Sequence, residues 1–304
     1  MKIRFGTRGS RLAMAQAGLV AGALRAHGVE IELITIRTSG DRLADVALAD
    51  FGGKALFVKE IEEAIVAGRV DAGVHSLKDM PALLPDGLEL AAFPSRGDVR
   101  DVLLTRRGGG LDDLPHGARV ATSSLRRRAL LLARRPDLMI EPIRGNVDTR
   151  LRKLEEGLCD ALVMAWAGLE RLGIKPERAH VLEAREFLPA VGQGTLAVEV
   201  RVNDGAVLRT LQRLDDPAAR AESLAERAFL RGLGAGCHTP VAGLAKVEGG
   251  QLFLDGLVAS VDGRTVIRGQ ADGFVDRAEA VGARLADDLL ARGAGAILAG
   301  KGPA

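Results

Sequence analysis

Short apolar runs alternate with amphipathic helical segments along the first part of the chain, and this alternation constrains the fold most. Apolar runs rich in β-branched residues predict strands, whereas apolar residues spaced three or four apart predict helices. We expect strands at 3–7, 31–37, 72–75 and 88–93 and helices at 11–27 and 58–67. Such alternation is typical of an α/β layer with a largely parallel sheet.

The same pattern begins again after residue 117. We expect strands at 118–122, 139–142 and 161–165 and helices at 125–134 and 147–156. In both halves the first strand runs into a turn rich in hydroxyl groups and arginine, Thr7 to Ser10 and then Thr122 to Arg127. We therefore predict two α/β domains that face each other across a cleft, with ligand groups at the carboxyl ends of the strands.

The rest of the chain is expected to connect these domains and to add a third. Residues 94–101 and 189–200 should form the connections, with Leu196–Val200 returning to the first sheet, and such a double crossover would form a hinge. A helix at 218–231, β-rich stretches around 252–259 and 265–268 and a helix near 277–291 are typical of an α+β domain. The predicted domains are residues 1–95 with 195–213, 99–189 and 217–304.

Composition argues against several classes of protein. A net charge of +2 and an aromatic content of 3%, without tyrosine, disfavour a nucleic-acid-binding surface. Two cysteines, Cys159 and Cys237, are too few for a disulfide framework or a zinc site with several thiolates, and we expect no metal. The chain opens directly on a predicted strand and has no long apolar run, so we expect a cytoplasmic protein without a membrane span.

The segment Thr122 to Arg127 predicts an anion-binding site. Free backbone N–H groups at a helix start, serine and threonine hydroxyls and arginine forks all bind oxyanions, which indicates a polycarboxylate or phosphate ligand. Arg144 and Arg150 flank the next strand-to-helix turn, and Arg171 follows the third strand. A single arginine is usually a solvated surface residue, but arginines at three successive strand ends favour a multiply anionic ligand.

Polar residues also follow the short apolar strand at 72–75. Lys78 and Asp79 are adjacent opposite charges before Pro81, and we expect them at a strand terminus rather than inside a helix. A carboxylate beside a cation at a cleft can stabilise a positively charged intermediate or accept a hydrogen bond from an N–H group. The alternatives are an ordinary turn ion pair and, for His75, a hydrogen-bonded core imidazole.

The two cysteines are interpreted differently. Cys159 lies in an apolar pattern and is expected to be an inert buried thiol. Cys237 follows three closely spaced glycines and precedes Pro240, so a loop presents its thiol, which indicates a nucleophile or a covalent anchor. His238 is adjacent to Cys237, and adjacent side chains seldom align for proton transfer, so a thiol hydrolase is not expected.

In combination and order, these motifs closely resemble the hydroxymethylbilane synthase family, also called porphobilinogen deaminases. The matching motifs are Thr7 to Ser10, Gly52 to Glu60, His75 to Pro81, Thr122 to Arg127, Arg144 to Arg150, Leu188 to Gly194 and Gly236-Cys237. The resemblance implies two periplasmic-binding-protein-like α/β domains around a cleft with hinge crossovers, plus a C-terminal α+β domain. It also implies a transferase of tetrapyrrole, porphyrin and heme biosynthesis that condenses four porphobilinogen molecules head to tail, releases ammonia and hydrolyses off hydroxymethylbilane.

By the same resemblance, a dipyrromethane cofactor is bound as a thioether to Cys237, and Asp79 is the catalytic carboxylate that stabilises the azafulvene cation formed as ammonia leaves. Cofactor binding is implied for Lys78, Asp79, Thr122, Ser124, Arg126, Arg127 and Arg150. Substrate binding is implied for Arg8, Ser10, Phe57, Arg144, Arg150, Arg171 and Gln193. The product of a monomeric enzyme would pass to the next tetrapyrrole enzyme.

The segment from Arg42 to Phe57 is expected to form a lid over the site. Here the chain departs from the family pattern, since Asp50 replaces a common lysine and Ala55 a common glycine, and His238-Thr239 also varies. Two other functions remain open from the residues alone. One is a two-domain anion- or solute-binding protein without catalysis, which predicts no covalent adduct, and the other is an RNA-binding module that uses the arginine turns.

Overall fold

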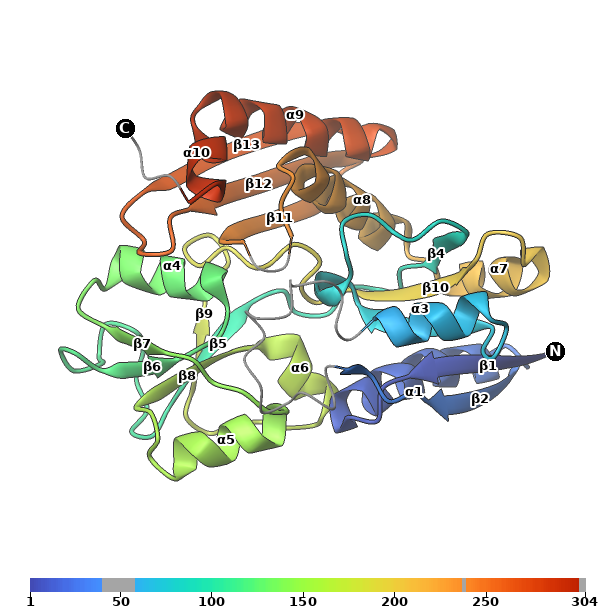
Figure 1. Ribbon diagram of the computed structural model, residues 1–304, viewed down its shortest axis with the longest axis horizontal. Helices are drawn as coiled ribbons and strands as arrows, with labels where there is room; N and C mark the ends of the chain where they lie inside the picture. Colours follow the sequence, from blue (N-terminus) through green and yellow to red (C-terminus); the bar gives the residue numbers. More distant parts are fainter. Residues whose placement is uncertain (40–57, 237–238, 301–304) are drawn as a thin grey trace. The chain divides into compact units, whose positions relative to one another are not determined.

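The computed structural model describes residues 1–39, 58–236 and 239–300. The chain divides into two compact units, Met1–Gly97 with Gly194–Arg220 and Asp98–Gln193 with Ala221–Ala304. Each unit contains a five-stranded mixed sheet with helices, and the second also contains a three-stranded antiparallel sheet (Figure 1). The predicted class, α/β with a C-terminal α+β part, is confirmed. In the described ranges, no helix combines the length and apolar character needed to cross a membrane.

The sheet of the first unit has the order β2-β1-β3-β10-β4. Its strands are β2 (Glu30–Thr35), β1 (Lys2–Thr7), β3 (Ala72–Ser76), β10 (Leu196–Arg201) and β4 (Leu88–Ala92). Strands β2, β1 and β3 are parallel, whereas β10 runs antiparallel to both of its neighbours. The expected return of Leu196–Val200 to the first sheet is therefore confirmed.

Helices α1 (Arg11–Ala26) and α3 (Lys59–Val66) cover opposite faces of this sheet. Side chains alternate along a strand, so Phe5 and Val74 join the core formed with α1, while Gly6 and Gly73 face Ile61 of α3. A short 3-10 helix, η2 (Leu77–Asp79), follows β3, and α7 (Gly205–Leu211) and η3 (Gln212–Leu214) follow β10. Lys78 and Asp79 therefore follow the strand terminus as expected, but the expectation that they lie outside any helix is wrong, since both belong to this single 3-10 turn.

The first sheet of the second unit repeats the same topology, with the order β7-β6-β8-β5-β9. Its strands are β7 (Met139–Glu141), β6 (Arg119–Ala121), β8 (Ala161–Ala165), β5 (Asp101–Thr105) and β9 (Ala179–Leu182). Again three strands are parallel, and the fourth, β5, is antiparallel to its neighbours. The weak sequence repeat therefore corresponds to a repeat of strand order.

Helices α4 (Leu125–Arg134), α5 (Val147–Glu155) and α6 (Trp166–Arg171) each follow one of the parallel strands of the second unit. The start of α4 is fixed by Ser124, whose hydroxyl accepts a hydrogen bond from the backbone N–H of Arg127 at 3.3 Å. This N-cap explains why the predicted limits of α4 agree with the structure.

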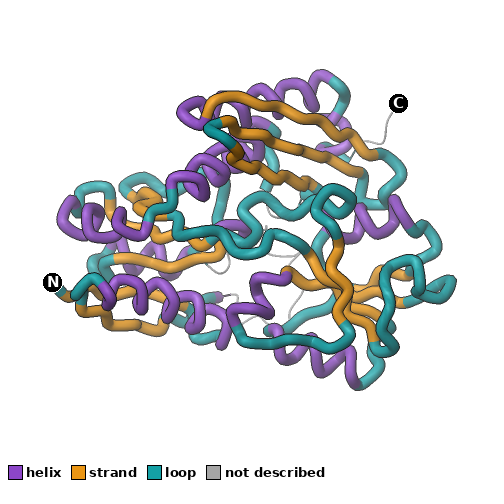
Figure 2. The backbone as a smooth tube through the Cα atoms, turned by 180° about the vertical axis from the view of Figure 1, so that it is seen from behind, coloured by secondary structure: helices purple, strands orange, loops and turns teal. Residues whose placement is uncertain are grey.

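The antiparallel sheet consists of β11 (Val241–Glu248), β12 (Gln251–Ala259) and β13 (Val266–Phe274). Helices α8 (Pro217–Gly232), α9 (Ala278–Ala291) and α10 (Ala294–Leu298) and the short η4 (Val275–Arg277) accompany it, as Figure 2 shows from behind. Leu257 and Ala259 of β12 share one hydrophobic core with Ala129 and Leu130 of α4. The C-terminal sheet therefore packs on the second α/β sheet within one unit.

Helices α8 and α9 approach closely at Gly282. A Cβ atom at this position would lie 2.1 Å from the carbonyl oxygen of Ala225 and 2.8 Å from the backbone nitrogen of Phe229. We expect Gly282→Ala to lower the free energy of unfolding by roughly 1–3 kcal/mol, because the helices must separate. Gly22→Ala in α1 is the matched control, since its Cβ would meet no described atom within 4 Å, and it should stabilise by up to about 1 kcal/mol.

Chemical denaturation of both variants measures these effects. Equal or greater stability of Gly282→Ala relative to the unaltered chain would show that the two helices do not pack as described.

Candidate active site

Three predicted site residues of the first unit line one small cavity. Strands β1 and β3 are parallel neighbours, so their carboxyl ends, and the turns that follow them, share one edge of the sheet. Arg8 and Ser10 come from the turn after β1 and Asp79 from the turn after β3, and together they line a cavity of about 60 Å³. The same cavity is lined by Gln16 and His75, among other residues.

Local hydrogen bonds fix the turns around this cavity. The Ser10 hydroxyl caps α1 by accepting from the backbone N–H of Ala13 at 3.3 Å. The Gln16 side-chain amide donates to the Ser76 hydroxyl at 2.8 Å, which ties α1 to the end of β3. Asp79 is exposed and Lys78 is half-buried. An exposed carboxylate at the end of a buried strand is available to a ligand.

The second unit collects predicted anion-binding groups at the carboxyl ends of β6, β7 and β8. Thr122 and Ser124 follow β6, Arg144 and Arg150 follow β7, and Arg171 follows β8. These strands are parallel, so the three turns lie at one edge of the sheet. Burial lowers the pKa of Arg171.

Hydrogen bonds within the protein shape these turns. Thr122 Oγ1 accepts from the backbone N–H of Ser124 at 3.2 Å, so the buried threonine organises the start of α4. Arg150 Nε donates to the carbonyl oxygen of Gly145 at 2.8 Å, which holds that guanidinium against its own turn. Gly145 has a φ of 108°, a conformation that favours glycine.

Asp101, which sequence reasoning missed, is the centre of a buried ionic network. Its Oδ2 accepts from Arg126 Nη2 at 2.7 Å, and its Oδ1 accepts from Arg127 Nη2 at 2.7 Å and from Gln193 Nε2 at 2.9 Å. Asp101 is completely buried. Burial alone would raise the pKa of Asp101, but the two guanidinium groups hold it well below its usual range.

Arg126 and Arg127 are accordingly buried, with 4% and 8% of their surface exposed. Arg126 Nη1 donates to the carbonyl oxygen of Leu188 at 2.7 Å, and Arg127 Nη1 donates to that of Val163 at 3.1 Å. Among the described residues, Arg126 Nε is buried without a hydrogen-bond partner. Both guanidinium groups therefore bind protein acceptors, and their predicted contact with cofactor carboxylates stays a prediction.

Three predictions lie outside the described residues. They are Cys237 as the attachment point, Phe57 at the border of the site, and the lid from Arg42 to Phe57 with its Asp50 and Ala55. The other cysteine, Cys159, is buried with 2% exposed surface, and burial raises the pKa of its thiol. The structure thus agrees with the interpretation of Cys159 as an inert core residue.

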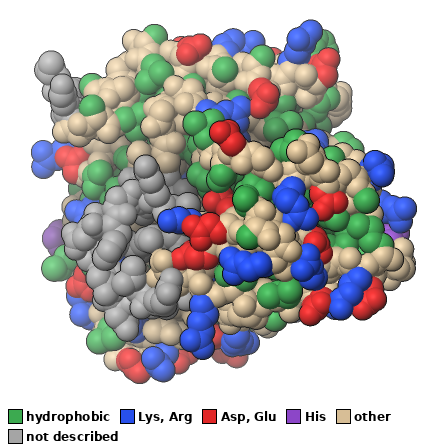
Figure 3. All heavy atoms as spheres, turned by 45° about the vertical axis from the view of Figure 1, so that its right-hand side comes forward, with side chains coloured by type: hydrophobic (Ala, Val, Ile, Leu, Met, Phe, Trp, Pro, Cys, Tyr) green, Lys and Arg blue, Asp and Glu red, His purple; other side chains and the backbone are tan. Residues whose placement is uncertain are grey.

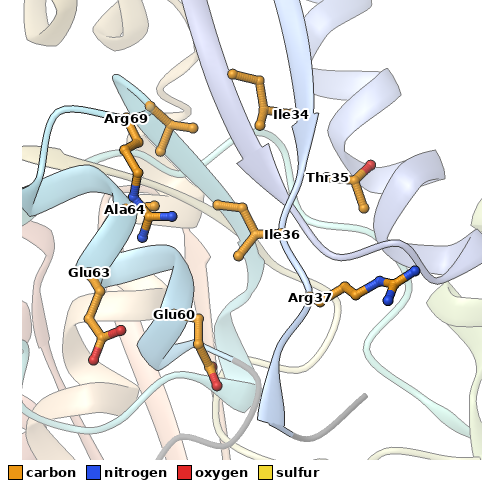
Figure 4. Close-up of a pocket in the computed structure, with 9 residues that line it drawn as sticks. Ile34, Thr35, Ile36, Arg37, Glu60, Glu63, Ala64 and Arg69 are labelled. Carbon is orange, nitrogen blue, oxygen red and sulfur yellow. The ribbon is translucent and has the colours of Figure 1, made fainter. Parts of the chain in front are cut away.

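A larger cavity, of about 350 Å³, lies elsewhere in the first unit (Figure 4). It is bounded by the end of β2 and the residues after it, by α3 and by the turn before β3. Its charged lining combines Glu60 and Glu63 with Arg37 and Arg69, and none of the predicted site residues belongs to it. The mixture of signs makes it a poor receptor for a polyanion. Acidic and basic side chains are also interspersed on the face of the molecule in Figure 3.

Comparison with known proteins distinguishes between the functions that the residues alone left open. Residues 3–209 match the family model described as porphobilinogen deaminase, dipyromethane cofactor binding domain, and residues 220–291 match porphobilinogen deaminase, C-terminal domain. The chain belongs to the porphobilinogen deaminase family. The matches cover most of the chain, so this membership applies to both units.

Curated relatives named porphobilinogen deaminase are similar over nearly their whole length. The relative from Syntrophobacter fumaroxidans is 48% identical over 298 residues, covering 97% of this chain and 96% of its own. Those from Desulforudis audaxviator and Roseiflexus castenholzii are each 50% identical, covering 97% and 98% of this chain and 96% and 99% of their own. A periplasmic binding protein of Salmonella typhimurium with high arginine specificity has a TM-score of 0.42 at 14% identity, covering 70% of this chain and 91% of its own.

Membership of the porphobilinogen deaminase family confirms the predicted function, a hydroxymethylbilane synthase of tetrapyrrole biosynthesis. It also confirms the transferase class and the dipyrromethane cofactor. The alternative of a solute-binding protein without catalysis is not favoured, because both family models describe a deaminase.

The Asp101 network predicts a pH-dependent stability. We expect Asp101→Asn to lower the free energy of unfolding at pH 7 by about 3–5 kcal/mol, because two buried guanidinium groups lose their counter-charge. The pKa of Asp101 is lower in the folded than in the unfolded state, so its contribution is complete above the unfolded value, near pH 4, and declines as the pH falls below it. The difference between the two proteins should therefore shrink in acid.

Denaturant titrations at several pH values measure this difference. Asp288→Asn is the control, because Asp288 pairs with Arg292 on the surface of α9 with about half of its side chain exposed, where such pairs contribute less than about 1 kcal/mol. Equal stability losses in both variants would contradict the central position of Asp101.

Proposed function

We propose that Asp79 is the carboxylate that carries the condensation chemistry of this porphobilinogen deaminase. The observation that supports it is the shared cavity, which places Asp79 with Arg8 and Ser10 at the carboxyl edge of β1 and β3. Asp79 is exposed, so its oxygens can reach a substrate. The Arg8 guanidinium group can donate two hydrogen bonds to a substrate carboxylate, and the Ser10 hydroxyl can donate a further one beside it.

The chemistry of porphobilinogen suits this arrangement. The substrate carries a pyrrole N–H, two carboxylates and an aminomethyl group. As ammonia leaves, the carbon–nitrogen bond breaks and positive charge develops on the pyrrole ring. Asp79 accepts a hydrogen bond from the pyrrole N–H and stabilises that positive charge, while arginine side chains hold the substrate carboxylates in place. A new carbon–carbon bond then forms, and the attacked ring loses a proton.

The donor set of the second unit fits a dipyrromethane. Two pyrrole rings bring four carboxylates, and this edge of the sheet offers guanidinium groups, hydroxyls and the start of α4, where Arg126 Nε is buried without a described partner. We assign cofactor binding to Lys78, Asp79, Thr122, Ser124, Arg126, Arg127 and Arg150, and attachment to the Cys237 thiol. When bound, the cofactor supplies the free pyrrole carbon onto which the first substrate condenses.

We assign binding of the substrate and the growing chain to the following groups, of which Arg150 also serves the cofactor. These are Arg8, Ser10, Phe57, Arg144, Arg150, Arg171 and Gln193. Gln193 is buried and donates a hydrogen bond to Asp101. It therefore also helps to hold Asp101 in the position in which it binds Arg126 and Arg127. Because Asp101 orders both arginines, we assign it a positioning role that sequence reasoning missed.

The proposal extends to the organisation of the chain. Its domains are residues 1–95 with 195–213, 99–189 and 217–304, each built on one of the three sheets. Residues near 94–101 and 189–200 form the hinge. The chain acts as a monomer in the cytoplasm and passes hydroxymethylbilane to the next enzyme of tetrapyrrole biosynthesis.

Asp79→Asn tests the assignment. The amide keeps the size of the side chain but removes the negative charge, so we expect turnover of porphobilinogen to fall at least about 100-fold. Ammonia release and substrate consumption measure turnover, and Asp86→Asn, in the exposed turn before β4, is the control that should leave it unchanged. Near-normal turnover of Asp79→Asn would remove Asp79 from the mechanism.

A further inference from the structure

Three titratable side chains are buried together beside the Asp79 cavity. Glu62 of α3, His75 of β3 and Glu199 of β10 have 7%, 5% and 0% of their surface exposed. His75 Nε2 lies 3.0 Å from Glu199 Oε2. A sheet face covered by a helix normally carries apolar side chains, because burial of charged groups is costly. Two carboxyl groups and an imidazole at this place therefore indicate a function.

The strand register explains how the cluster forms. His75 is paired with Ala197, and Glu199 lies two residues further along β10, so both side chains are on the face covered by α3. Gly73 provides the space, because a Cβ atom there would lie 2.7 Å from His75 Nε2 and 2.8 Å from Ile61 Cγ2. The cluster is therefore built into the central strands of the first unit.

The cluster has more carboxyl groups than cations. Burial, and then the charge of Glu199, raise the pKa of Glu62 to about 7, against a smaller opposing effect of His75. Within the described ranges, neither Glu199 oxygen nor Glu62 Oε1 accepts a hydrogen bond of good geometry. Two carboxyl groups and one imidazole that are this close together and this deeply buried interact strongly through their charges.

Other charged groups from the neighbouring elements have their own partners. Glu63 of α3 is more than half exposed, and its charge adds only the smallest of the effects that raise the pKa of Glu62. Arg201 of β10 pairs with Asp204 and donates to two backbone carbonyl groups, and Arg4 of β1 pairs with Asp71. The cluster meets the site at its other end, where His75 lines the same cavity as Asp79.

We propose that His75, Glu199 and Glu62 take up the proton that the attacked pyrrole carbon loses at each condensation, with His75 at the wall of the cavity. The proposal rests on the proposed condensation beside Asp79. The substrate amine enters as ammonium and leaves as ammonia, and the new carbon–carbon bond displaces one proton from the ring. The cluster receives that proton and returns it to ammonia or water, so the cycle is balanced. Glu199 and Glu62 act through His75 and are positioning residues.

The pH dependence of turnover tests this role with Glu62→Gln and its matched control, Glu63→Gln. A proton acceptor must be deprotonated, so turnover of the unaltered protein should rise with pH through the range in which the cluster titrates. Removal of one of two repelling carboxyl groups should move this rise at least about one pH unit lower in Glu62→Gln. Glu63→Gln should move the profile much less, because Glu63 is more than half exposed and its charge has the smallest of the effects that shift the pKa of Glu62. A uniform loss of turnover with an unmoved profile would indicate a structural role and overturn the proposal.

A second readout is independent of turnover. In cofactor-loaded protein labelled with ¹³C-histidine, His75→Gln identifies the His75 signal among the five histidines. We expect Glu62→Gln to move the pH midpoint of this signal and Glu63→Gln to leave it in place. The same shift should persist on an Asp79→Asn background, in which turnover is expected to be at least about 100-fold lower, and this separates the proposal from the role of Asp79. A midpoint that Glu62→Gln leaves unmoved would overturn the cluster.

Folding of the variant is checked separately. The pKa of Glu62 is higher in the folded state, so its stabilising effect at low pH is lost as the pH rises through about 7. Glu62→Gln should consequently unfold at a higher temperature than the unaltered protein at pH 8. A lower unfolding temperature would show that burial does not destabilise the charged Glu62 carboxylate, and the cluster as proposed would then be wrong.

Discussion

The buried contact of Asp101 with Arg126 and Arg127 is the interaction on which the edge of the second unit that we propose to bind anions depends. A buried carboxylate is costly unless it is paired and hydrogen-bonded, and here both oxygens are satisfied. The contact joins the first residue of β5, the first turn of α4 and Gln193. Two guanidinium groups that would otherwise repel each other are thereby held side by side at the start of a helix.

The repeated topology explains why such groups meet. In each five-stranded sheet, three parallel strands bring their carboxyl ends to one edge, and an antiparallel fourth strand brings its amino end to the same edge. Asp101 opens the fourth strand of one sheet, and Leu196 opens that of the other. Site residues can thus follow a parallel strand or precede an antiparallel one, as Asp101 opens β5 and the predicted Gln193 lies just before β10.

Elements with clear local signals were predictable from the sequence. Helix α4 has a serine cap and strand β8 is uniformly apolar, and both agree with their predicted limits. Strand β5 was missed because only its first residue falls in the predicted connection 94–101 and the residues after it were assigned to no element. Strand β11 was missed because alanine and glycine weaken its pattern. Short edge strands such as β9 carry little hydrophobic signal of their own.

Part of the candidate site was predictable because its residues follow a strand. Arg8, Ser10 and Asp79 were found in this way, and the structure brings them to one cavity. Asp101 and Glu199 could not be found, because a single acid next to an apolar run looks like a solvated residue until its partners are known. Those partners are distant in sequence, since Asp101 contacts Gln193 and Glu199 contacts His75. Burial of charge is a property of the assembled sheet rather than of any segment.

We propose that the chain carries its dipyrromethane on Cys237, and intact-mass spectrometry of three purified proteins tests this attachment most directly. The unaltered chain and Cys159→Ser should both show the polypeptide mass plus two pyrrole units, whereas Cys237→Ser should show the polypeptide mass alone. An adduct retained by Cys237→Ser, or a bare polypeptide mass for the unaltered chain, would contradict the account.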